Sequence, residues 1–190
     1  FSLNNDKDIA TGRFLYESKE DIQCDSVHEI EVNGKKRYVN CLRTSKDPKD
    51  VCPLCMEEYK LLVKLFIPFY DEESGEVKIW DRGNSYKAKF ESLCSRYNPL
   101  VSTIFEIERN GKKGDTKTEY SFFATTTDTL VLENFPEVPE LLGSLILDKT
   151  YDELNYYLDN GCFEEVSEQA EEPAPARTAR TPAAGRSQSN

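Results

Sequence analysis

The strongest structural signal in the chain is the stretch His28-Glu-Ile-Glu-Val-Asn-Gly-Lys-Lys-Arg-Tyr-Val-Asn-Cys41. Its centre, Asn33-Gly34, lies between β-branched and aromatic residues, and Asn-Gly in such a setting is the strongest short-range signal of a β-hairpin. We therefore predict two short antiparallel strands between residues 29 and 40. The stretch begins with the only histidine of the chain and ends with one of its six cysteines.

This histidine and three cysteines have the spacing of a metal site. His28, Cys41, Cys52 and Cys55 form the pattern His-x12-Cys-x10-Cys-x2-Cys, and three cysteines with one histidine suit tetrahedral zinc. Four protein ligands leave no open position for water, so the pattern predicts one structural Zn2+ rather than a catalytic one. Cys24 is the reserve ligand. The alternative is a set of ordinary buried cysteines and an unrelated histidine.

The predicted zinc would serve folding. The segment 44–51 is polar and contains little that could pack, so it needs another source of order. Zinc would fix the hairpin to the start of the next helix, and its binding free energy then becomes folding free energy. We place this zinc subdomain at about residues 24–62.

Outward from this region, strand signals outnumber helix signals. Alternating apolar residues predict a strand at 9–16, a hairpin around the polar turn 71–75, and another hairpin formed by 103–109 and 116–124. Helical spacing predicts helices at 86–97, 140–147 and 151–158, and a helix within 55–66 that runs into a strand at 64–70. The fold class we predict is mostly β with a few helices.

Composition limits the possible functions. The chain has 190 residues, 38% of them hydrophobic, and a net charge of -11, which suits one domain at 1–163 followed by a polar, disordered tail at 164–190. No apolar run approaches the roughly 18 residues of a membrane helix. The first residues include neither an initiator Met nor an export signal, so we expect a cytoplasmic protein with unpaired cysteines.

The order of these motifs resembles a known family. The run Gly12-Arg-Phe-Leu15, then His28, then Asn33-Gly-Lys35 leading into a cysteine, then Cys52-Pro-Leu-Cys55 resembles the single-stranded-DNA-binding (helix-destabilising) proteins of T-even-type bacteriophages. In that family one His and three Cys bind zinc. The run Gly75-Glu-Val-Lys-Ile-Trp80 is similar to the family's central hairpin, and residues 105–122 to its later strand pair. The resemblance covers about residues 9–125.

The resemblance implies an OB-fold β-barrel with an inserted zinc subdomain. It also implies a protein that coats and protects single-stranded DNA, largely without sequence preference, during phage DNA replication, recombination and repair in the cytoplasm of an infected bacterium. Family members have a basic N-terminal arm and an acidic, partner-recruiting tail, whereas this chain has an acidic start and ends in Arg186-Ser-Gln-Ser-Asn190. By this resemblance, the protein would bind phage replication and recombination proteins through its C-terminal tail.

Binding single strands requires cations for phosphates and aromatic faces for bases. Despite the negative net charge, the positive residues cluster, and with Trp80 and several tyrosines they form our predicted DNA contacts. The set is Lys35, Lys36, Arg37, Tyr38, Arg43, Lys78, Trp80, Arg82, Tyr86, Arg109, Lys112, Lys113 and Tyr120. The alternatives are that Trp80 and the tyrosines pack in the core or at its rim, and that the 110–115 turn is only solvated.

Two other functions compete with this hypothesis. An enzyme is disfavoured because the chain has no second histidine, no glycine-rich phosphate loop and no nucleophile motif. The pair Asp71 and Glu72 could suggest a metal-dependent nuclease, but it lies in a predicted turn. The second competitor is a zinc-stabilised protein-interaction or transcription module, whose acidic surface would meet a basic partner.

Overall fold

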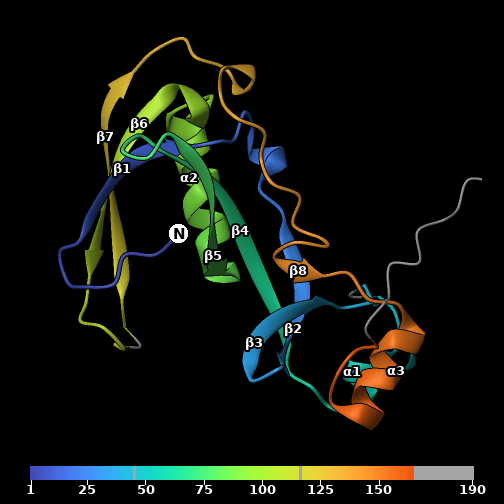
Figure 1. Cartoon of the computed structure of the whole chain (residues 1–190). Coiled ribbons are helices and arrows are strands. Elements are labelled where there is room, and N and C mark those ends of the chain that lie inside the picture. Colours follow the sequence, from blue (N-terminus) through green and yellow to red (C-terminus); the bar gives the residue numbers. More distant parts are fainter. Residues whose placement is uncertain (45, 116, 165–190) are drawn as a thin grey trace, which may run out of the picture.

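A computed structural model describes residues 1–44, 46–115 and 117–164. Within these ranges the protein is mostly β, with three α-helices and one mixed sheet (Figure 1). The strands are β1 (Ile9–Phe14), β2 (Cys24–Val32), β3 (Lys35–Asn40), β4 (Leu61–Asp71), β5 (Glu76–Gly83), β6 (Thr103–Asn110), β7 (Glu119–Thr127) and β8 (Ile146–Leu147). The helices are α1 (Pro53–Met56), α2 (Lys87–Arg96) and α3 (Tyr151–Asn160).

The long strand β4 organises the sheet. It pairs with β5 from Lys64 to Asp71, while its residues 61–65 pair with β2 and its residues 69–71 pair with β1. Its run Leu-Leu-Val-Lys-Leu-Phe-Ile-Pro-Phe-Tyr-Asp is rich in β-branched and aromatic residues, which favour strands. In Figure 1, β4 runs diagonally from the region of α2 to the region of the β2–β3 hairpin.

The strand order is β7-β6-β1-β4-β2-β3-β8, with β5 paired to β4 outside this order. All named pairs are antiparallel except β3 with β8, which are parallel. Over the ranges that the structure describes, no pairing joins β7 to β8, so the sheet is not closed into a barrel there. The mostly β class is confirmed.

Buried side chains form a larger core, a smaller core, and a third cluster of Val27, Phe66 and Ile146. The larger core contains Phe14, Phe69, Trp80, Phe90 and Phe105, all fully buried, and it lies between β1, β4, β5, β6 and α2. A smaller core is formed by Ile30, Val39, Cys52, Leu54, Cys55, Leu154 and Tyr157, where the β2–β3 hairpin meets α1 and α3. The β2–β3 hairpin and α3 thus belong to a second lobe of the molecule (Figure 1).

Most predicted elements are confirmed, and two helices are not. The predicted helix within 55–66 is limited to the single turn Pro53–Met56, and strand β4 already begins at Leu61. The predicted helix 140–147 is wrong: Gly143 has a left-handed φ of 81°, and Ile146 pairs with Tyr38 and is 1% exposed. Burial of Ile146 against the hairpin overrides the local helical pattern.

Three further expectations concern the cysteines, membrane-spanning helices and the C-terminal tail. None of the six cysteines forms a disulfide in the structure. No helix in the described part of the chain is both long and apolar enough to cross a membrane. The predicted disordered tail at 164–190 lies, apart from Glu164, outside the described residues.

Arg13 on β1 fastens two loops to the larger core. Its side chain is only 5% exposed, and its Nη2 donates to Asp128 at 2.7 Å while its Nε donates to Glu72 at 2.8 Å. Its Nη1 also donates to the carbonyl of Val101. A buried guanidinium that lost a partner would leave an uncompensated charge, so these contacts are costly to break.

This ion pair predicts an acid-dependent stability. The hydrogen bond from Arg13 lowers the pKa of Asp128 in the folded protein below its ordinary value, which is about 3.9 in an unfolded chain. Stabilisation by the Asp128 carboxylate is therefore fully present above about pH 4 and is lost as the pH falls through the lower folded value. Thermal melts of the wild type and Asp128→Asn should differ at pH 7 and converge in acid. A difference that stays constant down to pH 2.5 would contradict this assignment.

Candidate metal centre and nucleic-acid interface

The predicted metal ligands lie together. His28 is in β2, Cys41 directly follows β3, Cys52 precedes α1, and Cys55 is within it. Pro53 occupies the first turn of α1, where its fixed φ favours helix initiation, and this turn brings both thiols of the Cys-x2-Cys motif to one side. The four ligand atoms all lie within 4.8 Å of one another, so the group could hold a metal ion.

The distances within the group are short and regular. The Sγ atoms of Cys41 and Cys55 are 3.7 Å apart, and Nε2 of His28 lies 3.7 Å from Sγ of Cys52 and 3.5 Å from Sγ of Cys55. His28 and Cys52 are fully buried. The reserve ligand Cys24 is not in the group: its thiol is hydrogen-bonded to Oδ1 of Asn84 at 3.4 Å.

The surroundings of His28 prepare its ring for metal binding. Its Nδ1 lies 3.3 Å from the carbonyl oxygen of Lys60, so an Nδ1–H donor would leave Nε2 free to face the thiols, as in many metal sites. Burial lowers the pKa of His28, which favours the neutral imidazole that a metal requires. Burial also raises the pKa of Cys41 to about 12, so its thiolate needs a nearby positive charge.

The group is the centre of the smaller core. Leu154 and Tyr157 of α3 pack against it, and the hydroxyl of Tyr157 donates to the carbonyl of Glu31 at 3.1 Å. Helix α3 begins at a capping box in which Thr150 and Glu153 exchange hydrogen bonds, and it ends at Gly161 with a left-handed φ. A metal at this point would link the β2–β3 hairpin to α1, and α3 would cover the site through the apolar contacts of Leu154 and Tyr157.

Three predicted DNA contacts lie on one groove. Lys36, Arg37 and Tyr38 of β3 line a cavity of about 390 Å³ together with Ile79 and Asp81 of β5. Lys36 pairs with Glu29 at 2.6 Å, Arg37 donates to the carbonyl of Ser144, and the Tyr38 hydroxyl donates to Asp81 at 3.0 Å. Lys35 is exposed at the adjacent turn.

The prediction that Trp80 offers an exposed stacking face is wrong. Trp80 is fully buried, and its ring centroid lies 4.8 Å from that of Tyr120. The alternation of side chains along β5 was correct, but the face that carries Lys78, Trp80 and Arg82 turns toward the larger core. Lys78 at the edge of that face pairs with Asp71 at 2.5 Å instead of standing free.

Arg109 and Tyr120 are also buried, so the predictions that Arg109 is an open phosphate contact and that Tyr120 offers an exposed ring to a base are wrong. All three nitrogens of the Arg109 guanidinium donate within the protein. They bond to the carbonyls of Leu3, Gly111 and Lys112, to the Tyr120 hydroxyl and to Oγ1 of Thr118. Arg109 therefore organises the β6–β7 turn, whose Lys112 and Lys113 are exposed.

Arg82 and Tyr86 lie near Trp80 and Tyr120 but are less buried than these two residues. The Arg82 guanidinium lies 4.2 Å from the Trp80 ring centroid and 4.6 Å from that of Tyr120. Lys89 of α2, which the sequence reasoning missed, has its Nζ 4.5 Å from the Phe122 ring centroid and donates to the Tyr120 carbonyl. Its helical spacing from Tyr86 was the signal that could have identified it.

Arg43 lies apart from the other predicted DNA contacts. It lies two residues after the ligand Cys41. Its backbone N–H lowers the pKa of the Cys41 thiol against the larger effect of burial, and its Nε is buried with no partner in the described residues. Arg43 is thus placed to offset the negative charge of thiolates rather than to line the groove.

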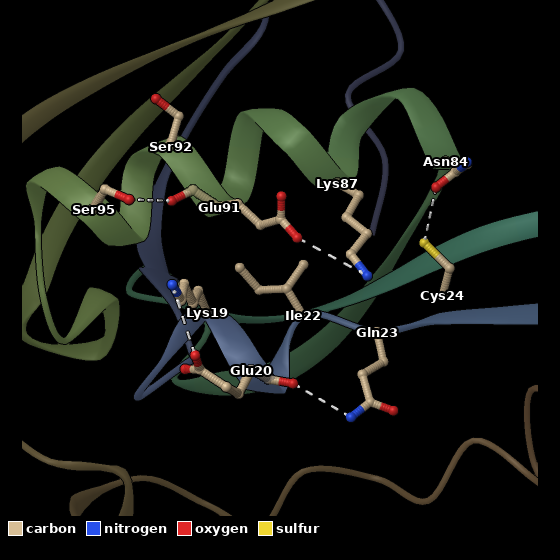
Figure 2. A pocket seen from close by; sticks show the side chains of 10 residues that line it. All are labelled: Lys19, Glu20, Ile22, Gln23, Cys24, Asn84, Lys87, Glu91, Ser92 and Ser95. Carbon is tan, nitrogen blue, oxygen red and sulfur yellow. Dashed lines mark hydrogen bonds and ion pairs between the residues drawn. The ribbon is translucent and has the colours of Figure 1, made fainter.

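A cavity of about 1000 Å³ lies elsewhere, between α2 and the start of β2 (Figure 2). Figure 2 shows Lys87 and Glu91 of α2 facing Ile22 and Lys19 across it. Its wall contains Cys24 at the edge, bonded to Asn84. None of the metal-binding group and none of the predicted DNA contacts lines this cavity.

Fold and site together define a mostly β protein with a Cys3His group that could hold a metal ion. Comparison with known proteins adds no family: no family model matches the chain, and no curated protein matches it. Functional assignment therefore depends on the residues and their geometry.

Proposed function

We propose that this protein binds single-stranded DNA largely without sequence preference, and that it protects the strand without cleaving it. The observation that carries the proposal is the groove between β3 and β5, where Lys36, Arg37 and Tyr38 meet Ile79. The order of sequence motifs, which resembles that of T-even phage single-strand binders, adds support. It also favours a role in phage replication, recombination and repair inside an infected bacterium.

The groove has the chemistry that a single strand requires. Lys36 and Arg37 are exposed and could meet phosphates, while the half-buried ring of Tyr38 and the side chain of Ile79 offer apolar contact to bases. The acidic groups at the groove are already paired, Glu29 with Lys36 and Asp81 with Lys64. Local pairing therefore reduces the repulsion that the net charge of -11 would otherwise exert on DNA.

Zinc is the metal we propose for the Cys3His group. A tetrahedral ion with Zn–S bonds of about 2.3 Å and a Zn–N bond of about 2.0 Å separates two sulfur ligands by about 3.8 Å, and sulfur from nitrogen by about 3.5 Å. Here the sulfurs of Cys41 and Cys55 are 3.7 Å apart, Nε2 of His28 is 3.7 and 3.5 Å from the sulfurs of Cys52 and Cys55, and all four ligand atoms lie within 4.8 Å of one another. Four protein ligands complete the coordination, so this zinc would be structural.

We assign the sheet to the OB type as part of this proposal. Strand β4 shares its edges among β1, β2 and β5, and such sharing bends a sheet around its core, as in small partly open barrels. The groove then lies where β3 and β5 approach each other outside the larger core.

A titration with fluorescent oligo(dT) tests the proposal. We expect the wild type to bind oligo(dT) and to bind a matched duplex far more weakly, with an affinity that falls steeply as salt rises, because phosphate contacts release counterions. Tyr38→Leu should weaken binding by roughly 1–3 kcal/mol if the ring stacks on a base. Tyr151→Leu is the matched control, since Tyr151 is exposed on α3 and away from the groove.

Two outcomes would redirect the proposal. Loss of the intact oligonucleotide in Mg2+ or Mn2+ would indicate a nuclease. No binding at low salt by the zinc-loaded protein would contradict the proposal and favour a zinc-stabilised protein-interaction module, for which the acidic charge of the chain is the supporting observation.

A further inference from the structure

Three cationic side chains converge on Tyr120 of β7. Arg82 Nη2 and Arg109 Nη1 donate to the Tyr120 hydroxyl at 3.1 and 3.0 Å, and Lys89 Nζ donates to the Tyr120 carbonyl. They come from β5, from α2, which follows β5 closely in the sequence, and from the later strand β6. Like charges repel, so such a convergence is unfavourable unless something compensates it.

Within the described ranges, none of these cations forms an ion pair. The ion pairs found there involve other cations, and the neighbouring Asp81 bonds to Lys64 and Tyr38 on the opposite face of β5. Burial lowers the pKa values of Arg82 and Lys89. Glu119 and Asp81 act on Lys89 and Arg82 only through space, without a direct ion pair, and burial has the larger effect on both cations.

Unused hydrogen-bond donors accompany this charge. Nε of Arg82 and Nε1 of Trp80 are buried and have no partner in the described residues. The Tyr120 oxygen accepts from two guanidinium groups, and its own proton has no acceptor within the described residues. A buried donor without an acceptor costs about 1–3 kcal/mol, and an anion at the partly exposed Arg82 side chain would offer acceptor oxygens to its guanidinium.

We propose that Arg82, Lys89 and the Tyr120 hydroxyl form a phosphate-binding site. Arg82 would offer its guanidinium edge to phosphate oxygens while its faces rest against Trp80 and Tyr120. Lys89 supplies a second positive charge. The hydrogen-bond donors of Arg109 are all used within the protein, so Arg109 contributes only the electrostatic attraction of its charge. The inference rests on the proposed function: the phosphate is a phosphodiester of the bound single strand, and free phosphate is the other source.

Arg82→Met tests the site directly. Met keeps much of the length and the packing of Arg82 between the two rings but removes charge and donors. We expect oligo(dT) affinity to fall about tenfold, and the slope of log K against log salt to become shallower by about 0.7 for one lost phosphate contact. Lys89→Met, on the exposed side of α2, should act similarly without disturbing the core. Arg96→Met is the control, because Arg96 is exposed at the end of α2.

Two further probes distinguish the source of the phosphate. Oligo(dT) with neutral methylphosphonate linkages should show no difference between the wild type and Arg82→Met. Inorganic phosphate, followed through the Nε–H signal of Arg82 in ¹⁵N-resolved NMR spectra, should shift that signal only at concentrations far above those of oligo(dT). A shift by inorganic phosphate at low concentration would instead identify free phosphate as the ligand of the site.

The failures of the two proposals are distinguishable. If the wild type binds oligo(dT) but folded Arg82→Met and Lys89→Met retain its affinity and salt slope, the phosphate site is wrong and single-strand binding stands. If neither oligo(dT) nor inorganic phosphate affects the Arg82 signal, the phosphate site is wrong whatever the strand does. If only inorganic phosphate binds, the site stands and single-strand binding fails.

Discussion

Removal of the metal is expected to unfold the smaller lobe of the protein. The core there contains few apolar side chains, and two of its seven fully or nearly buried members are the thiol ligands Cys52 and Cys55. Apparent binding free energies of structural zinc are roughly 10–16 kcal/mol in small domains, so the ion would outweigh the apolar contacts. Cys52→Ser, or chelation of the wild type, should therefore cost several kcal/mol of folding free energy.

Hydrogen exchange read peptide by peptide measures this effect. Protection should be lost in the β2–β3 hairpin, α1 and α3, and should persist in β6 and β7, which belong to the larger core. Cys162→Ser is the matched control, because Cys162 is exposed and outside the metal-binding group. Uniform protection in the metal-free protein would show that the apolar core alone maintains this lobe.

Gly12→Ala is expected to have an effect of similar size on the other lobe. Gly12 lies in β1 between Asp71 of β4 and Phe105 of β6. A Cβ at this position would stand 2.1 Å from the carbonyl oxygen of Tyr70 and 2.4 Å from the ring of Phe69. The carbonyl is part of the sheet and cannot move without breaking the β1–β4 pairing, so we expect a loss of about 3 kcal/mol or more.

Chemical denaturation of the variant tests this prediction, with Gly83→Ala as its control. Gly83 is at the end of β5, where an added Cβ would meet only Oγ of Ser85 at 3.9 Å. The midpoint of unfolding should fall strongly for Gly12→Ala and little for Gly83→Ala. Equal midpoints would mean that β1 can move away from β4 without cost.

Local signals predicted most elements and the metal-binding group. Asn33-Gly34 specified the first hairpin because its residues adopt positive φ at low cost, and both do so here, with φ of 53° and 71°. The Cys-x2-Cys motif and the single histidine predicted the ligand set because few residue types bind such metals. These features depend on sequence neighbours, which is why they could be found without a structure.

The orientation of faces could not be predicted in the same way. Alternation along β5 separates Lys78, Trp80 and Arg82 from Val77 and Ile79, but it does not say which set faces the core. That choice depends on Tyr120 and Phe122, about forty residues away, which pack against Trp80. The buried role of Arg109 likewise depends on Leu3, whose carbonyl it contacts across 106 positions.

The pairing of β4 with several strands determines how rigid the proposed groove would be toward a bound nucleic acid. One continuous β-strand contributes Leu65, Ile67 and Phe69 to the larger core, pairs with β2 through residues 61–65, and pairs with β5 from Lys64 to Asp71. Both walls of the groove are therefore connected to β4, β5 directly and β3 through β2, so they cannot move apart as two hinged bodies. A flexible nucleic acid that enters would have to adopt the curvature of the protein, and the loss of conformational freedom on binding would fall on the DNA.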